Sequence, residues 1–310
     1  ISKWGFSFRP EYEALSGLRG HFPNATLSAF TATADTATRQ EIASKLFGGK
    51  GDIVVRGFDR PNLQLAVTPK TDRHKQLLDF LEPRRDGSGI VYCLSRKLTD
   101  ETARLLRVKG YKALPYHAGL PQDVRRENQE TFMAEDGVIM VATIAFGMGI
   151  DRPDVRFVVH AGLPKGVEQF SQETGRAGRD GLSAECALFF SGSDYHGWRN
   201  LLEKGHEDAE QLESSIQRLG HIWRLATGAN CRHRALVEYF GQSWTKGDCG
   251  SCDVCLHELE AVEDGTVTAQ KVLSCVVRVE ERFGAKHVCD VLRGTKTAQV
   301  TRYEHDVLST

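Results

Sequence analysis

The chain has 310 residues, and its 40 Lys and Arg against 41 Asp and Glu give a formal net charge of −1 at pH 7. This balance excludes a protein whose whole surface attracts nucleic acid, although a local basic groove can lie on a neutral protein. A hydrophobic content of 40% and a charged content of 26% are ordinary for a globular protein. No apolar run approaches the roughly 20 residues that cross a membrane, and no signal-peptide pattern opens the sequence. We therefore expect a cytoplasmic protein of about two domains that binds no membrane.

The amino-terminal segment alternates aromatic and basic side chains, among them Trp4, Phe8 and Arg9. Aromatic faces stack on nucleobases, and Lys or Arg between them neutralises phosphates. The same pattern also occurs in loops whose rings fill a protein core, so both interpretations stay open.

The next segments indicate strands and a helix separated by short polar stretches. The apolar run 25–30 predicts a strand, 35–46 predicts a helix, and 53–56 predicts another short strand. The TATA sequence at 31–34 either connects a phosphate site with a neighbouring lobe or caps the following helix. The proline and polar residues at 58–62 discourage regular structure, which predicts a hinge into a second lobe.

From residue 87 onward, strands alternate with helices. This order predicts a parallel sheet with helices on both faces, and ligands of such sheets bind at the carboxyl ends of the strands. After the last strand, the sequence is helical from 194 to 228. The predicted strands are 89–93, 112–116, 138–141, 155–160 and 185–190, and the predicted helices between them are 98–109 and 122–133.

Polar or small residues follow the predicted strands at Ser95-Arg96, His117–Gly119, Thr143 and Gly147–Asp151. Each of these segments alone is typical of a turn or a helix cap. Glycines at such positions let the backbone approach a ligand closely. Their common position at the carboxyl ends of parallel strands indicates a functional edge.

Gln172, Arg176 and Arg179 lie close together in the polar segment after the strand 155–160. Two guanidinium groups can grip one phosphate through paired hydrogen bonds. Arginines at positions i and i+3 are also common on a solvated helix face, which is the alternative interpretation.

Four of the eight cysteines gather in one region, which favours a metal over disulfides. Closely spaced cysteines can hold one tetrahedral Zn²⁺ with a further thiolate from an upstream helix, and such an ion stabilises a small element without a core of its own. His233 and His257 are alternative ligands, and the same pattern also occurs with cysteines that are free, disulfide-bonded or redox-active. The predicted ligands are Cys231, Cys249, Cys252 and Cys255.

The segment 138–181 resembles the last two helicase motifs of the RecQ family of DNA helicases, within helicase superfamily two. The resemblance is carried by the sequences ATIAFGMGIDRPDVRFVVH and QETGRAGRDG. The cysteine pattern, with RHR and YFG between the cysteines, resembles the zinc-binding domain of this family. The sequences RFGA and LRGTK near the carboxyl terminus resemble the start of its winged-helix domain.

This resemblance implies an α/β fold in which a RecA-like parallel-sheet helicase lobe is followed by a helical zinc-binding domain and the start of a winged-helix domain. Residues 1–57 would be the carboxyl-terminal part of a first RecA-like lobe, and residues 58–192 a second one. Residues 193–262 would form the zinc-binding domain, and residues 263–310 an incomplete winged-helix (RecQ C-terminal) domain.

The resemblance also implies roles for individual residues. Arg179 would be an arginine finger that reaches the γ-phosphate of ATP from the second lobe, with Arg176 assisting. Gln172 would orient the water or link the state of the phosphate to DNA. Gly149 and Asp151 would face the nucleotide, with Asp151 on the ribose. The implied DNA-binding residues are Trp4, Phe8, Arg9, Ser95, Arg96, His117 and Thr143.

The implied function is ATP-dependent, 3′ to 5′ unwinding of DNA in repair, recombination and replication, with structural zinc and with ATP and Mg²⁺. The sequence contains no G-x-x-x-x-G-K-[ST] phosphate loop and no acidic Mg²⁺ motif, and Phe6-Ser7 stand where the family usually has His-Asp. We therefore expect a segment truncated at both ends, from a nucleoid-associated protein of a bacterial-type cytosol, that binds single-stranded and duplex DNA but hydrolyses no ATP by itself. Three rival functions stay open: a non-catalytic DNA-binding fragment, an RNA helicase of the same superfamily, and a zinc-stabilised scaffold that binds no nucleic acid.

Overall fold

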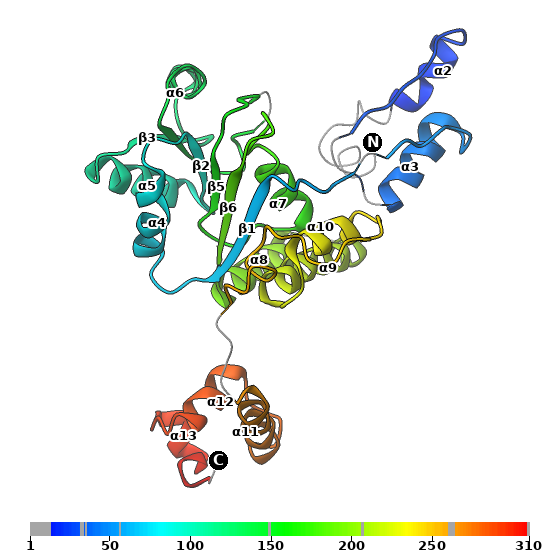
Figure 1. The fold of residues 1–310 in the computed structure, drawn as a ribbon. Helices are drawn as coiled ribbons and strands as arrows, with labels where there is room; N and C mark the ends of the chain where they lie inside the picture. Colours follow the sequence, from blue (N-terminus) through cyan, green and yellow to red (C-terminus); the bar gives the residue numbers. More distant parts are fainter. Residues whose placement is uncertain are drawn as a thin grey trace. The chain divides into compact units, whose positions relative to one another are not determined.

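The chain divides into two compact units, Ile1–Glu258 and Leu259–Thr310 (Figure 1). The computed structural model describes residues 14–31, 34, 36–55, 57–147, 150–205, 208–259 and 264–308. Within these ranges no helix has both the length and the apolar character needed to cross a bilayer.

The first unit is built on a sheet of six parallel strands in the order β1-β6-β5-β2-β4-β3, which confirms the predicted parallel sheet. β2, β4 and β5 are buried along their whole length, and this explains why they are continuous apolar runs in the sequence. The predicted strands do not include β1. The strands are β1 (Leu63–Pro69), β2 (Gly89–Tyr92), β3 (Lys112–Tyr116), β4 (Val138–Ala142), β5 (Phe157–His160) and β6 (Ala184–Phe190).

Helices cover both faces of this sheet, as predicted. On one face, Leu77 of α4 and Leu106 of α5 pack with Val91 of β2. On the other face, Phe132 of α6 packs with Ile90 of β2. The helices are α4 (Arg73–Leu81), the short η2 (Glu82–Arg84), α5 (Arg96–Val108), α6 (Gln122–Ala134) and α7 (Val167–Thr174).

The segment predicted as helical from 194 to 228 forms two helices, α8 and α9. Asp208 caps the start of α9, where its side chain accepts a hydrogen bond of 3.0 Å from the Glu210 amide. Leu219 and Ile222 of α9 pack with Phe190 at the end of β6, so these helices share a core with the sheet. The bounds are α8 (Gly192–Gly205), α9 (Ala209–Thr227) and α10 (Arg232–Tyr239).

The prediction of strands at 25–30 and 53–56 is wrong, because the described residues of both segments form no strand. A strand needs a hydrogen-bonding partner, and the described residues place none beside these segments. Phe30 and Val54 are 95% and 79% exposed, respectively. The predicted helix 35–46 is confirmed. The helices here are η1 (Leu15–Gly17), α2 (Leu18–His21) and α3 (Thr36–Phe47).

The second unit has a small apolar core that includes Cys275, Val288 and Val300. The apolar residues from Thr268 onward predict a helix through Phe283, but the first helix of this unit ends at Arg278. Glu280 and Glu281 adopt left-handed φ angles of 58° and 56°, which end the helix. The elements are α11 (Gly265–Arg278), α12 (Ala285–Leu292), α13 (Ala298–Arg302) and η3 (His305–Val307).

Candidate nucleotide and DNA site

The polar segments after β2, β3 and β4 meet at the carboxyl edge of the sheet. The Thr143 amide donates a hydrogen bond of 3.1 Å to the Tyr116 carbonyl, which joins the ends of β4 and β3. A Cβ on Gly119 would lie only 3.2 Å from Cδ of Arg96, so the loop after β3 packs against the start of α5. The structure thus brings the predicted residues of three separate loops together.

Ser95 caps α5, because its Oγ accepts a hydrogen bond of 3.2 Å from the Leu98 amide. The capping interpretation is therefore confirmed. Ser95 and Arg96 are both exposed, so the start of α5 presents a hydroxyl and a guanidinium to solvent. A role of these two residues in DNA binding stays a prediction.

His117 is only 5% exposed, and both of its ring nitrogens are used within the protein. Its Nδ1 accepts a hydrogen bond of 3.1 Å from the Gly119 amide, so Nε2 carries the proton and lies 3.0 Å from Oδ1 of Asp100. His117 therefore shapes the loop after β3. A direct contact with DNA stays a prediction for this residue.

The predicted arginines follow the end of α7, in a segment that we name the arginine turn, residues 175–179. Nη1 of Arg179 donates to Oδ1 of Asp151 at 2.5 Å and to the Ile150 carbonyl at 3.3 Å. The family resemblance predicts that Asp151 and Arg179 face the same nucleotide, and the structure places them in contact. Gln172 is exposed one helical turn before Arg176.

Arg176 lies against Gly147 in the loop after β4. A Cβ at Gly147 would overlap with Nη2 of Arg176, which explains why this position has no side chain. Nε of Arg176 is buried and has no hydrogen-bond partner within the described residues. Burial raises the pKa of the neighbouring Tyr92 hydroxyl, which donates a hydrogen bond of 3.3 Å to the Phe146 carbonyl.

A buried polar pair that the sequence does not predict fixes α7 to the sheet. Nε2 of His160, at the end of β5, lies 2.7 Å from Oε2 of Glu173 on α7, and the two side chains are 2% and 6% exposed. Gln169 donates a hydrogen bond of 3.0 Å to the other oxygen of Glu173. Glu173 immediately follows Gln172, so this pair determines how α7 presents its polar residues.

Some predicted site residues lie outside the described residues. They are Trp4, Phe8, Arg9 and Gly149.

The four predicted cysteine ligands gather at one point, and their sulfur atoms all lie within 4.8 Å of one another. A tetrahedral Zn²⁺ with metal–sulfur bonds of about 2.3 Å needs sulfur atoms about 3.8 Å apart, so the arrangement fits this ion. His233 lies elsewhere, with Nδ1 2.9 Å from Oδ1 of Asp59 and Nε2 3.0 Å from the Leu63 carbonyl. Within the described residues the cluster contains no histidine.

The cysteine-rich segment also continues the sheet. Leu65 of edge strand β1 receives a hydrogen bond of 2.9 Å from the Asp253 amide and donates one of 2.9 Å to the Ser251 carbonyl. The Val67 amide donates to Oδ2 of Asp253 at 3.0 Å. Arg232 forms a buried ion pair with Asp253 at 2.8 Å. The segment therefore covers the edge of the sheet.

Three family models match the chain: "Helicase conserved C-terminal domain" at residues 72–181, "RecQ zinc-binding" at 192–256 and "RQC domain" at 260–310. The ATP-dependent DNA helicase RecQ of Pasteurella multocida is 43% identical over 311 residues, covering 100% of this chain and 48% of the relative. The proteins of the same name from Haemophilus influenzae and Bacillus subtilis are 42% and 38% identical over 100% of this chain, covering 49% and 52% of their own lengths. The chain belongs to the RecQ family.

The RecQ chain spans about half the length of the curated relatives it matches. Membership confirms the resemblance found in the sequence and the predicted layout of a RecA-like lobe, a zinc-binding domain and an RQC domain. The cysteine cluster and the zinc-binding match together support a structural zinc ion, as predicted.

Proposed function

We propose that this RecQ chain functions in a protein that couples ATP hydrolysis to 3′ to 5′ unwinding of DNA in repair, recombination and replication. The observation that carries the proposal is the carboxyl edge of the sheet. There Arg176 packs on Gly147 and Arg179 contacts Asp151, and the start of α5 exposes Ser95 and Arg96. Cations beside glycine-containing loops suit a triphosphate and a nucleic-acid backbone.

In this proposal Arg179 acts as an arginine finger and Arg176 assists it. A guanidinium that neutralises charge on a transferring phosphoryl group raises the rate by about 10³- to 10⁵-fold. Arg179 would exchange its contact with Asp151 for one with the γ-phosphate, and Asp151 would then be available to the ribose. Gln172 would orient water from the exposed surface of α7, and Gly149 would let the backbone approach the nucleotide. Bound Mg²⁺ would supply charge neutralisation on the phosphates.

Single-stranded DNA would cross the edge formed by the loops after β2, β3 and β4. Ser95 and Arg96 expose donors at the start of α5, where the helix dipole also favours an anion. Thr143 lies beside them, and His117 would support the loop. Trp4, Phe8 and Arg9 would add base stacking and phosphate contacts.

We assign the zinc ion to Cys231, Cys249, Cys252 and Cys255, and we propose the domain bounds 1–57, 58–192, 193–262 and 263–310. A cytoplasmic, nucleoid-associated location and binding of duplex DNA by the RQC domain belong to the same proposal.

The test compares ATP hydrolysis by this chain with hydrolysis by an extended protein, in which the amino-terminal half of the Pasteurella multocida relative precedes this chain. We expect no turnover by the chain alone and DNA-stimulated turnover by the extended protein. In the extended protein, Arg179→Ala is expected to lower kcat by about 10³-fold or more. Robust turnover by the chain alone, or an active Arg179→Ala variant, would contradict the mechanism.

A non-catalytic DNA-binding function is the second candidate, favoured because the sequence contains no phosphate loop. It predicts salt-dependent DNA binding by the chain alone, without nucleotide turnover. Competition between DNA and RNA of equal length separates both functions from that of an RNA helicase.

A further inference from the structure

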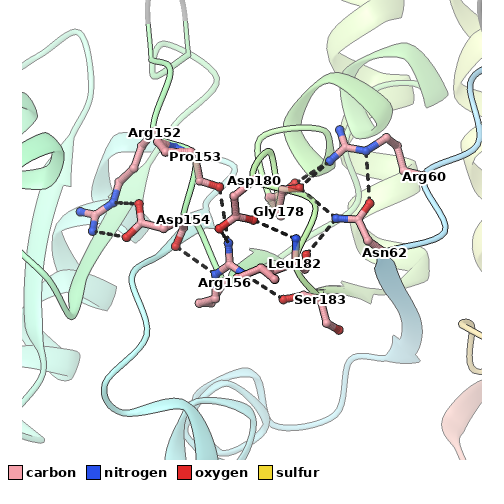
Figure 2. Close-up of polar contacts among 11 residues, drawn as sticks. Arg60, Asn62, Arg152, Pro153, Asp154, Arg156, Gly178, Asp180, Leu182 and Ser183 are labelled. Carbon is pink, nitrogen blue, oxygen red and sulfur yellow. Dashed lines mark hydrogen bonds and ion pairs between the residues drawn. The ribbon is translucent and has the colours of Figure 1, made fainter.

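The segment 58–62, which the sequence predicts to be a hinge, is fixed to the arginine turn at one end. Nη2 of Arg60 donates hydrogen bonds of 3.1 Å to the Ala177 carbonyl and of 3.0 Å to the Gly178 carbonyl, and Figure 2 shows Arg60 beside Gly178. Nη1 of Arg60 lies 3.5 Å from the Gly175 carbonyl. Nδ2 of Asn62 donates a further bond of 2.9 Å to Gly178. One guanidinium therefore contacts three carbonyls of the arginine turn.

These carbonyls belong to the backbone that leaves α7 at Thr174. The Gly178 carbonyl also accepts a hydrogen bond of 3.0 Å from the Gly181 amide, and the Gly175 carbonyl accepts one of 3.4 Å from Nε of Arg179, so Arg60 adds the contacts that join this turn to the segment 58–62. Gly178 has a left-handed φ of 56°, and a Cβ there would lie 2.6 Å from Nδ2 of Asn62. A cation at this end also complements the helix dipole. Arg60 thus holds the backbone that follows α7.

The other end of the segment is fixed to the zinc-binding region. Phe58 stacks on Phe240 with ring centroids 4.6 Å apart. Oδ1 of Asp59 lies 2.9 Å from Nδ1 of His233, and its Oδ2 lies 2.5 Å from Nζ of Lys246. Burial alone would raise the pKa of Asp59, but the hydrogen bonds from Lys246 and His233 outweigh burial and lower this pKa, so Asp59 is a carboxylate at neutral pH.

We propose that residues 58–62 form a strap between the zinc-binding region and the arginine turn, and that Arg60 is a positioning residue for Arg176 and Arg179. Arg60 does not touch the nucleotide; it acts by holding the backbone from which the two arginines project. This inference rests on the proposed function of Arg176 and Arg179.

The same loop supplies a matched control. Arg156 holds the far side of the loop, where Nη2 donates to Oδ2 of Asp180 at 2.6 Å and Nη1 donates to the Ser183 carbonyl at 3.1 Å (Figure 2). Its remaining donors bind the carbonyls of Asp154 and Pro153, rather than the carbonyls that Arg60 binds. Arg156→Ala therefore removes a guanidinium of similar environment without removing the strap.

The first experiment measures hydrogen exchange in this chain, and it is independent of any catalytic role. In the wild type, the amides of Arg176, Ala177 and Gly178 donate hydrogen bonds within 3.2 Å. Arg60→Ala is expected to raise the exchange rates of these amides by about 10-fold or more. Arg156→Ala is expected to leave their exchange rates within about 2-fold of the wild-type rates. Equal exchange in Arg60→Ala and wild type would overturn the strap.

The second experiment measures ATP hydrolysis by the extended protein. Arg60→Ala is expected to lower kcat by about 10- to 100-fold, with KM for ATP changed less than about 3-fold, because a displaced catalytic group mainly affects the transition state. Arg60→Lys keeps the positive charge but lacks the planar set of donors of a guanidinium, so its kcat is expected to lie between the kcat of Arg60→Ala and that of the wild type. This variant replaces Arg60→Ala if Arg60→Ala does not fold. Arg156→Ala retains wild-type kcat.

A double variant separates positioning from general stability. If Arg60 acts through Arg176 and Arg179, then Arg60→Ala lowers kcat no further in a protein that already carries both Arg176→Ala and Arg179→Ala. A further drop of about 10-fold or more would show that Arg60 acts independently and would overturn the positioning role. If the wild-type extended protein hydrolyses no ATP, the proposed function fails, while the exchange experiment still decides on the strap.

Discussion

The buried ion pair between Arg232 and Asp253 gives the sharpest prediction for stability. The two side chains are 3% and 4% exposed, with Nε 2.8 Å from Oδ1 and Nη2 3.0 Å from Oδ2. Asp253→Ala would leave the charge of Arg232 buried without its partner and would orphan the Val67 amide of β1. Breaking a buried ion pair in this way lowers the free energy of unfolding by about 3–5 kcal/mol. This is a large share of the free energy of unfolding of a typical domain, which is about 5–15 kcal/mol.

The assay is urea unfolding followed by the fluorescence of Trp198 and Trp223, which are half-buried in α8 and α9. The control is Glu203→Ala, which removes an exposed pair with Arg199 at 2.9 Å and is expected to lower the free energy of unfolding by less than about 0.5 kcal/mol. Zinc content is measured alongside, since Asp253 lies between two of the cysteines.

If zinc-loaded Asp253→Ala has a free energy of unfolding less than about 1 kcal/mol below that of the wild type, the reasoning is refuted, because the buried charge of Arg232 then tolerates the loss of its partner. A double variant, Arg232→Met with Asp253→Leu, removes both charges and is expected to be more stable than Asp253→Ala alone. The double variant is expected to stay less stable than the wild type, because Arg232 also donates hydrogen bonds of 2.6 and 2.7 Å to the Leu225 and Gly228 carbonyls, and the variant loses them.

Three further predictions concern DNA, zinc and pH. Arg96→Ala is expected to weaken binding of a fluorescent single-stranded oligonucleotide and to reduce the salt slope by about 1, as measured by anisotropy at several salt concentrations; an unchanged slope would place DNA elsewhere. Removal of zinc by a chelator is expected to lower the thermal midpoint of the first unit by about 10 °C in calorimetry, with recovery when zinc is returned. The hydrogen bond from Arg152 lowers the pKa of Asp154 below its ordinary 3.8, so its stabilisation is present above that pH and is lost as pH falls through the folded pKa. The difference in urea midpoint between wild type and Asp154→Asn should therefore shrink between about pH 6 and pH 3, whereas a constant difference would argue against ionisation of Asp154 as its source.

The strands and helices of the sheet could be predicted where the sequence has a strong local pattern. β3 has the predicted bounds, and α6 ends one residue later than predicted, because apolar periodicity and turn residues mark both elements. β1 alternates buried and exposed residues, which is the pattern of a half-buried strand, so the sequence contained a signal for β1 that the prediction did not use. The strands predicted at 25–30 and 53–56 have strand-like composition, but strand formation depends on a partner that local sequence does not reveal.

The candidate site could be predicted through motifs, whereas its supporting contacts could not. Arg60 and the carbonyls it binds are 115 to 118 residues apart in the sequence, and neither side shows a local pattern that indicates the other. The pair of His160 and Glu173 also depends on tertiary packing, because a histidine at a strand end has several possible partners. Ser95 illustrates a different limit, since a motif residue and a helix cap have the same sequence signal and one side chain serves as the cap here.

The position of β1 explains why a zinc site matters beyond its own helices. β1 is an edge strand, and an uncovered edge exposes unpaired backbone groups. On the exposed side of β1, the backbone amide and carbonyl of Leu65 form hydrogen bonds with Ser251 and Asp253 of the cysteine-rich segment. Zinc ligation therefore also completes the sheet. β1 begins directly after Asn62, which holds Gly178. Loss of zinc should therefore loosen β1 first and the arginine turn next, so hydrogen exchange at Leu65 should rise before exchange at Gly178 as zinc is withdrawn.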